Sequence, residues 1–213
     1  MKVVDMRRAT RLLAIAVWAA MRPLLWSCSE ADDTVNEYAD WQRRNDTFVF
    51  SLADSLWQPS SQGQWLRFKS FSKDETTEGT AADYIYAKVL EQGSGTTSPL
   101  YTDTVRVSYI GRLMPVASVP EGAVFDKTFT GQFSWQTTGV IDAVVSGFVD
   151  GFTTAMLHMH RGDRWRVYIP YQLGYGSRTS GSVPAYSTLI FDVALVDYCP
   201  PGETMPKWNA RKR

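Results

Sequence analysis

The chain has 213 residues, a length typical of one domain or of one domain with an appended segment. Its 22 basic and 22 acidic residues give a formal net charge of zero, and no basic tract is longer than the last few residues, so a nucleic-acid-binding protein is not predicted. A hydrophobic fraction of 44% excludes wholesale disorder. With two cysteines and two histidines, a disulfide scaffold, a metal site or a cofactor is not predicted either.

Residues 1–28 have the pattern of an export signal. Basic residues from Lys2 to Arg11 precede the apolar run 12–21, which is about half the ~20 residues of a bilayer-spanning helix. The segment Leu25-Trp26-Ser27-Cys28 resembles the lipobox of bacterial lipoproteins, so Cys28 is the predicted acylation site. A diacylated cysteine anchors a soluble domain to a membrane, and Cys199 then has no disulfide partner. This predicts the cell envelope of a Gram-negative bacterium, with the chain lipid-anchored to the periplasmic or surface face of the outer membrane. A plain secretory signal with an incidental thiol is the alternative.

A helix is predicted next, opened by the capping box Thr34-x-x-Glu37 and ended before Pro59. Apolar residues recur every three or four positions, with Asn45 as the polar exception. This stripe consists of Val35, Tyr38, Trp41, Phe48, Leu52 and Leu56. One interpretation of the stripe is the interface of a homodimer.

Several strands and a second helix are predicted after the first helix. The strands are residues 65–71, 84–90, 105–111, 164–169 and 189–196, and the helix is residues 152–159. The last strand is apolar on both faces apart from Asp192, which is typical of a central strand, and we interpret Asp192 as a structural partner. One helix against several antiparallel strands predicts the α+β class.

Metal or nucleophile catalysis is not supported by the sequence. His158 and His160 are two positions apart, so on a helix they point to different faces. A nucleophile elbow and a phosphate-binding loop are both absent. Spacing alone leaves open an acid/base pair among Asp126, Asp142 and Asp150.

Seven short motifs follow one another in a fixed order. They are Val105-x-Val107-x-Tyr109-x-Gly111-x-Leu113, Gly122-x-x-Phe125-Asp126, Phe148-Val149-x-Gly151-Phe152, Met159-x-x-Gly162-Asp163, Ile169-Pro170, Leu173-Gly174-Tyr175-Gly176 and Val183-Pro184-x-Tyr186-Ser187-x-Leu189-x-Phe191-Asp192. This order resembles the FKBP-type peptidyl-prolyl cis-trans isomerases over residues 83–198. The resemblance implies an antiparallel half-barrel sheet wrapped around one short helix. The implied organisation is a helix-and-strand extension (29–82), an isomerase domain (83–200) and a C-terminal tail (201–213).

The resemblance also implies an aromatic pocket that turns X–Pro peptide bonds without a cofactor. Its implied lining residues are Tyr109, Phe125, Asp126, Val149, Phe152, Tyr175, Val183 and Phe191. The Val149 N–H and the Tyr175 phenol are implied to bind substrate carbonyls, and Asp126 to bond Tyr109 or the ligand. Phe152 is implied to form the floor, where the family usually has tryptophan. Without the resemblance, Val149, Phe152 and Phe191 would serve equally well as ordinary core.

Two functions stay open at this point. The first is an isomerase that helps exported proteins fold, with proline-containing polypeptides as partners and macrolides as inhibitors. The second is a non-catalytic peptide-binding or chaperone module, which Phe152 and the long insertion between Asp126 and Phe148 favour. Phe133 in this insertion is interpreted as a pocket wall.

Overall fold

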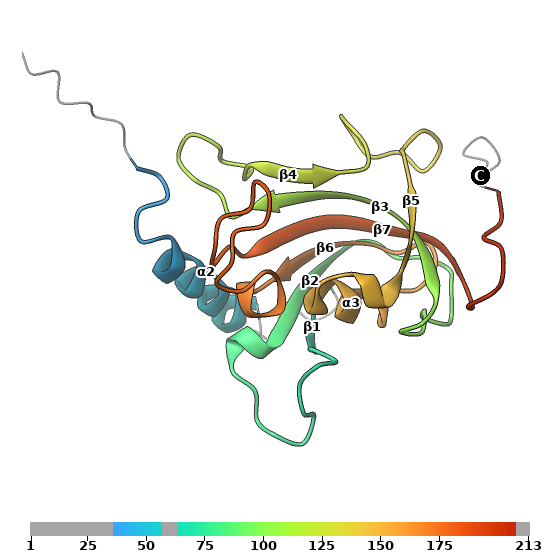
Figure 1. Cartoon of the computed structure of the whole chain (residues 1–213), viewed down its shortest axis with the longest axis horizontal. Coiled ribbons are helices and arrows are strands. Elements are labelled where there is room, and N and C mark those ends of the chain that lie inside the picture. The colour runs from blue at the N-terminus through green and yellow to red at the C-terminus, as the bar shows by residue number, and fades with distance from the viewer. Residues whose placement is uncertain (1–35, 57–63, 208–213) are drawn as a thin grey trace, which may run out of the picture. The chain divides into compact units, whose positions relative to one another are not determined.

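The computed structural model describes residues 36–56 and 64–207 (Figure 1). The described residues from Glu37 onward belong to one compact unit. The predicted export signal and Cys28 lie outside the described residues. Among the residues that are described, no helix combines the length and the apolar character needed to cross a membrane.

An antiparallel sheet forms the centre of the unit. Its strands are β1 (Trp65–Lys69), β2 (Tyr84–Glu91), β3 (Thr104–Leu113), β4 (Val124–Lys127), β5 (Ile141–Val144), β6 (Arg164–Ile169) and β7 (Leu189–Cys199). The strand order is β1-β2-β6-β7-β3-β4, and β5 pairs with the other half of β3. Strand β7 lies between β6 and β3, which confirms the central position predicted from its two apolar faces.

The helices are α2 (Trp41–Leu56) and α3 (Asp150–Met156), with short 3₁₀ helices η2 (Ala81–Asp83), η3 (Val145–Gly147) and η4 (Tyr171–Leu173). Helix α3 packs against one face of the sheet, called here the inner face, while α2 lies at the end of the sheet where β3 ends and β7 begins (Figure 1). The α+β architecture predicted from the sequence is therefore confirmed.

Alternation along the strands separates the inner face from the outer face. In β6, Trp165, Val167 and Ile169 are buried, and the residues between them are only partly buried. Successive side chains in a strand point to opposite faces, so these three residues face α3. They form one core with Phe152 and Met156 of α3. Packing in this core holds α3 in place, and Phe152 on this helix therefore lies against β3 and β7.

Helix α2 begins later than the sequence predicts. Asp40 has a φ of 52°, outside the right-handed helical region, and the helix starts at the next residue, Trp41. Thr34 of the predicted capping box lies outside the described residues, and the carboxylate of Glu37 accepts the Ser118 N–H at 2.7 Å. Glu37 therefore ties the chain before α2 to the connection between β3 and β4.

The polar exception in the α2 stripe has a structural role. Asn45 is fully buried, and its Oδ1 accepts the Thr188 N–H at 2.7 Å. One turn earlier, the Trp41 indole donates to the Ser187 hydroxyl at 2.8 Å. Part of the stripe interpreted as a dimer interface is thus packed against the same chain, on the segment just before β7.

Candidate functional site

Four of the aromatic residues that the resemblance assigned to a pocket come together on the inner face. Phe191 is central: its ring centroid lies 4.9 Å from that of Phe152, 5.4 Å from Phe125 and 5.7 Å from Tyr109. Tyr109 and Phe152 are 5.9 Å apart. The rings meet edge to face, which is the favoured geometry for aromatic pairs. Four separate elements, β3, β4, α3 and β7, thereby supply one ring cluster.

Gly111 makes this close packing possible. It lies two residues after Tyr109 on β3 and therefore on the same face of the sheet. A Cβ atom at Gly111 would lie 2.6 Å from Cζ of Phe125 and 2.8 Å from Cε1 of Phe191. Only glycine leaves both rings room to lie over β3.

A carboxylate is bonded to the edge of the cluster. The Tyr109 hydroxyl donates to Oδ2 of Asp126 at 2.6 Å, and Oδ1 of Asp126 accepts the Lys127 N–H at 2.8 Å. Burial and the hydrogen bond to Asp126 raise the pKa of the Tyr109 phenol above its ordinary value of 10.0, with a further contribution from nearby Tyr175. Tyr109 therefore stays neutral and keeps its donor role over the whole physiological pH range.

The cluster has a buried floor and a more exposed rim. Phe152 and Phe191 are 2% and 6% exposed, whereas Tyr175 is 38% exposed and Phe125 is half-buried. Val149 precedes α3 and is also half-buried.

Two polar groups near the cluster are available to a ligand. Within residues 36–56 and 64–207, neither the N–H of Val149 nor the phenol of Tyr175 makes a hydrogen bond. Val183 is buried in the same hydrophobic core, in a turn closed by the hydrogen bond from its N–H to the Ser180 carbonyl. An apolar ring of a ligand could therefore pack on the buried floor of Phe152 and Phe191. Backbone carbonyls of the ligand could accept hydrogen bonds from the Val149 N–H and the Tyr175 phenol.

Phe133 does not belong to this cluster, so its interpretation as a pocket wall is wrong. The guanidinium of Arg164 lies 4.5 Å from the centroid of the Phe133 ring. Arg164 alternates with buried Trp165 in β6 and therefore projects from the outer face. The neighbouring Trp135 donates to Glu91, which also forms an ion pair with Arg164 at 2.9 Å. The insertion is held against the outer face by these contacts.

Phe148 also contacts the ring cluster, although the sequence did not predict it as a pocket residue. Its ring centroid lies 4.5 Å from that of Phe152, and the residue is half-buried. The available signal was its position four residues before Phe152 in the same motif.

Three of the remaining titratable candidates, His158, Asp142 and Asp192, have structural partners. His158 bonds the Thr154 carbonyl through Nδ1 at 2.8 Å, and Asp142 forms an ion pair with Arg106 at 2.6 Å. Asp142 lies opposite Arg106 and Asp126 lies opposite Gly111 on β3, and these two β3 residues are on opposite faces of the sheet. Asp142 therefore does not face Asp126, and the prediction of an acid/base pair formed by these two is wrong. Asp192 accepts two hydrogen bonds from Arg166, which confirms its structural role. No group of three or more potential metal ligands occurs in the described part of the chain.

Known proteins share both the sequence pattern and the fold. Residues 95–196 match the family model of the FKBP-type peptidyl-prolyl cis-trans isomerases. The chain is 36% identical over 111 residues to the FKBP-type 22 kDa peptidyl-prolyl cis-trans isomerase of Escherichia coli, covering 52% of this chain and 48% of that protein. It is 30% identical over 155 residues to the isomerase FkpA of Escherichia coli, covering 71% and 51%.

The chain spans about half the length of these curated relatives. The crystal structure of FkpA from Escherichia coli has a TM-score of 0.52 to this structure at 22% identity, covering 93% of this chain and 75% of FkpA. That likeness establishes a common fold.

Proposed function

Because residues 95–196 match the model of the FKBP-type peptidyl-prolyl cis-trans isomerase family, we propose that the chain belongs to this family and catalyses rotation about X–Pro peptide bonds. The observation that carries this proposal is the cluster of Tyr109, Phe125, Phe152 and Phe191 with Asp126 bonded to its edge. We assign the catalytic role to residues 83–200, and the whole set of eight pocket residues implied by the resemblance is part of the proposal.

The reaction needs no covalent bond to the protein. Rotation of an X–Pro bond is opposed by a barrier of about 20 kcal/mol, because amide resonance is lost when the bond twists. The twisted imide has less charge separation than the planar form, so its carbonyl depends less on hydration. A water-poor aromatic site therefore favours the twisted state over both planar states, which is preferential binding of the transition state.

The inner-face cluster supplies such surroundings. In the proposed complex the prolyl ring lies on Phe152 and Phe191, which are almost completely buried. The phenol of Tyr175 and the N–H of Val149 donate to substrate carbonyls, since both lack partners within the described residues. These bonds hold the chain on one side of the imide while the other side turns. Asp126 orients the Tyr109 ring through their hydrogen bond.

A protease-coupled assay on an X–Pro tetrapeptide tests the proposal. We expect the wild-type chain to accelerate isomerisation, and Tyr109→Ala and Asp126→Ala to lower kcat/KM by about tenfold or more, as expected when about 1.4 kcal/mol of transition-state stabilisation is lost. Matched controls are Tyr101→Ala and Asp74→Ala, which alter exposed residues outside the cluster. Absence of catalysis in the wild type, or equal effects of test and control variants, would reject the enzyme.

Phe152 favours a second candidate, a peptide-binding module without catalysis. Phenylalanine keeps the floor apolar but lacks the indole N–H of the tryptophan usual in the family. Saturable binding of the same tetrapeptide with no acceleration of its isomerisation would support this module over the enzyme.

The proposal includes export and lipid anchoring at Cys28. Its basis is the sequence of residues 1–28 alone, and its expected substrates are proline-containing exported polypeptides. Metabolic labelling with an alkyne fatty acid tests it: wild type incorporates the label and Cys28→Ser does not. Equal labelling of both chains, or of neither, would contradict acylation at this residue.

A further inference from the structure

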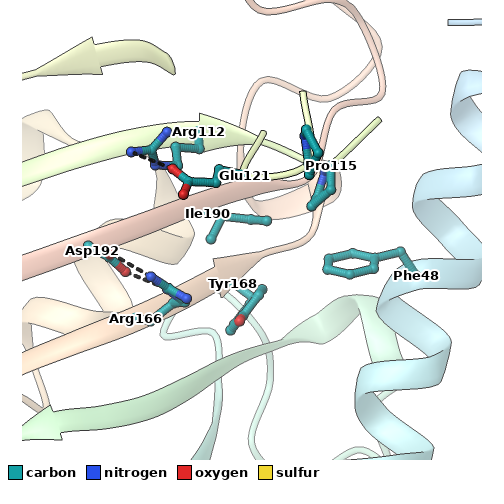
Figure 2. Close-up of a pocket in the computed structure, with 9 residues that line it drawn as sticks. Phe48, Arg112, Pro115, Glu121, Arg166, Tyr168, Ile190 and Asp192 are labelled. Carbon is teal, nitrogen blue, oxygen red and sulfur yellow. Dashed lines mark hydrogen bonds and ion pairs between the residues drawn. The ribbon is translucent and has the colours of Figure 1, made fainter. Parts of the chain in front are cut away.

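The outer face of the sheet carries a cavity that the proposed catalysis does not use. Its volume is about 400 Å³, within the range of about 300–1,000 Å³ typical of small-ligand sites. It lies between α2, the connection from β3 to β4, and the outward side chains of β3, β6 and β7 (Figure 2). The aromatic cluster lies on the opposite face, so an occupant of this cavity would not contact the proposed isomerase site.

The cavity combines apolar walls with arginine side chains. Phe48 points from α2 toward Ile190 and Tyr168, and the guanidiniums of Arg112 and Arg166 lie over the strands (Figure 2). A second hollow, lined by Arg43 and Arg44 of α2, shares Phe48 and Pro115 with the first. The two hollows therefore adjoin, and their combined lining contains apolar side chains, four arginines and the carboxylates of Glu121 and Asp192.

The two guanidiniums of the cavity are held differently. Arg166 donates to both carboxylate oxygens of Asp192, at 2.6 and 2.8 Å, so its plane is fixed. Arg112 lies 3.8 Å from Glu121, whose side chain is 84% exposed, and makes a long hydrogen bond of 3.3 Å to the Gly122 carbonyl. A solvated ion pair of this kind contributes little stability, so a ligand carboxylate can replace Glu121 at small cost. Arg112, itself only 26% exposed, is the group best placed to receive it.

We propose that this cavity is a second peptide-binding site, which takes an acidic side chain on Arg112 and a neighbouring apolar side chain against Phe48 and Ile190. Charge favours an acidic peptide, because four arginines and only two carboxylates line the two hollows, and one of these carboxylates, Asp192, is already bonded to Arg166. A neighbouring apolar side chain is favoured by the partly exposed rings of Phe48 and Tyr168 and the exposed Pro115, which line the cavity with Arg112 above the buried Ile190. Binding at this site does not depend on catalysis at the inner face.

Amide chemical-shift mapping of the ¹⁵N-labelled full-length chain tests the proposal. The probe is acetyl-Ala-Glu-Phe-Ala-amide, which is blocked at both ends and contains no proline, and its control contains Gln in place of Glu. We expect the Glu peptide to shift the signals of Arg112, Tyr168 and Ile190, and the Gln peptide to bind about tenfold more weakly, the loss expected for one charge-assisted hydrogen bond. Equal affinities, no shifts, or shifts confined to Tyr109 and Tyr175 would overturn the proposal.

Variants separate this site from a general effect of charge. Arg112→Gln is expected to weaken the Glu peptide about tenfold, whereas Arg67→Gln, which alters an arginine stacked on Tyr84 outside the cavity, leaves affinity unchanged. Both variants are expected to retain the wild-type rate on an X–Pro tetrapeptide, so failure of the binding site and failure of the isomerase are distinguishable. Equal effects of the two variants on peptide affinity would overturn the site. So would Arg112-dependent binding of phosphatidylglycerol vesicles without binding of the peptide, because that result would identify a membrane contact instead.

Discussion

At Gly111, a missing side chain determines how the aromatic site is packed. The rings of Phe125 and Phe191 occupy the space where a Cβ atom would lie, at 2.6 and 2.8 Å. Neither ring can withdraw freely, since each packs against other rings of the cluster or the core. The geometry of the proposed pocket thus depends on the absence of a Cβ atom at position 111 of β3.

Gly111→Ala is therefore predicted to damage activity. We expect kcat/KM on an X–Pro peptide to fall about fivefold or more, with a stability loss of about 1–3 kcal/mol from overpacking. Gly147→Ala is the matched control, because a Cβ there meets no atom within 4 Å. Wild-type activity in Gly111→Ala would show that the ring positions do not matter for catalysis.

The phenol of Tyr109 is predicted to make stability fall at alkaline pH. Its folded-state pKa is raised, first by burial and then by Asp126, so the unfolded chain loses this proton at a lower pH than the folded chain does. Stability from this group is complete below pH 10 and is lost as the pH rises toward the folded-state pKa, by up to about 1.4 kcal/mol per pH unit. Urea unfolding at pH 8 to 11 should show a shallower decline for Tyr109→Phe than for wild type. Parallel declines would contradict the assigned environment of Tyr109.

Among the elements, α2 is part of the same folded unit as the sheet. Its buried Asn45 and Trp41 bond residues 187 and 188, which join the loop carrying Tyr175 and Val183 to β7. Phe191 follows only three residues later. The helix therefore fixes one end of the segment that supplies three of the proposed pocket residues.

Asn45→Ala is predicted to destabilise the unit by about 1–3 kcal/mol, since it leaves the buried Thr188 N–H without its acceptor. Thr47→Ala serves as the control, because Thr47 lies on the exposed side of the same helix and bonds only a backbone carbonyl within it. The measurement is the urea midpoint of each variant. A loss in Asn45→Ala no larger than in Thr47→Ala would mean that α2 is not coupled to this segment.

The sequence predicted the elements with strong periodicity and missed those without it. The central position of β7 followed from its apolar faces, whereas β4 and β5 are four-residue strands with mostly exposed side chains and so show little alternation. The resemblance carried by the order of the motifs correctly predicted that the four rings of Tyr109, Phe125, Phe152 and Phe191 lie together. Phe133 was misplaced because its position depends on Arg164, a contact in the fold that the spacing of residues in the insertion cannot indicate.

In the whole molecule, the two faces of one sheet have different chemistry. The inner face presents aromatic rings and one bonded carboxylate, and the outer face presents arginines beside apolar walls. The sequence predicted a homodimer through the apolar stripe of residues 35–56, but Trp41 of this stripe packs against the same chain. We therefore propose that such a dimer would use the exposed side of α2, where Phe50 is 68% exposed. We expect Phe50→Asp to lower the mass found by analytical ultracentrifugation from two chains to one. A wild-type mass equal to that of one chain would contradict the proposed dimer.

The central claim is that a water-poor ring cluster turns an X–Pro bond with no covalent step. The most direct test is NMR exchange spectroscopy, which measures the cis–trans interconversion rate of a proline peptide at equilibrium without a protease. Without catalysis, the interconversion has a time constant of tens to hundreds of seconds, which is too slow for exchange peaks. Catalytic amounts of the wild-type chain should accelerate it until exchange peaks appear, and Asp126→Ala and Tyr109→Ala should reduce this acceleration. A rate that stays at its uncatalysed value with the wild-type chain would contradict the account.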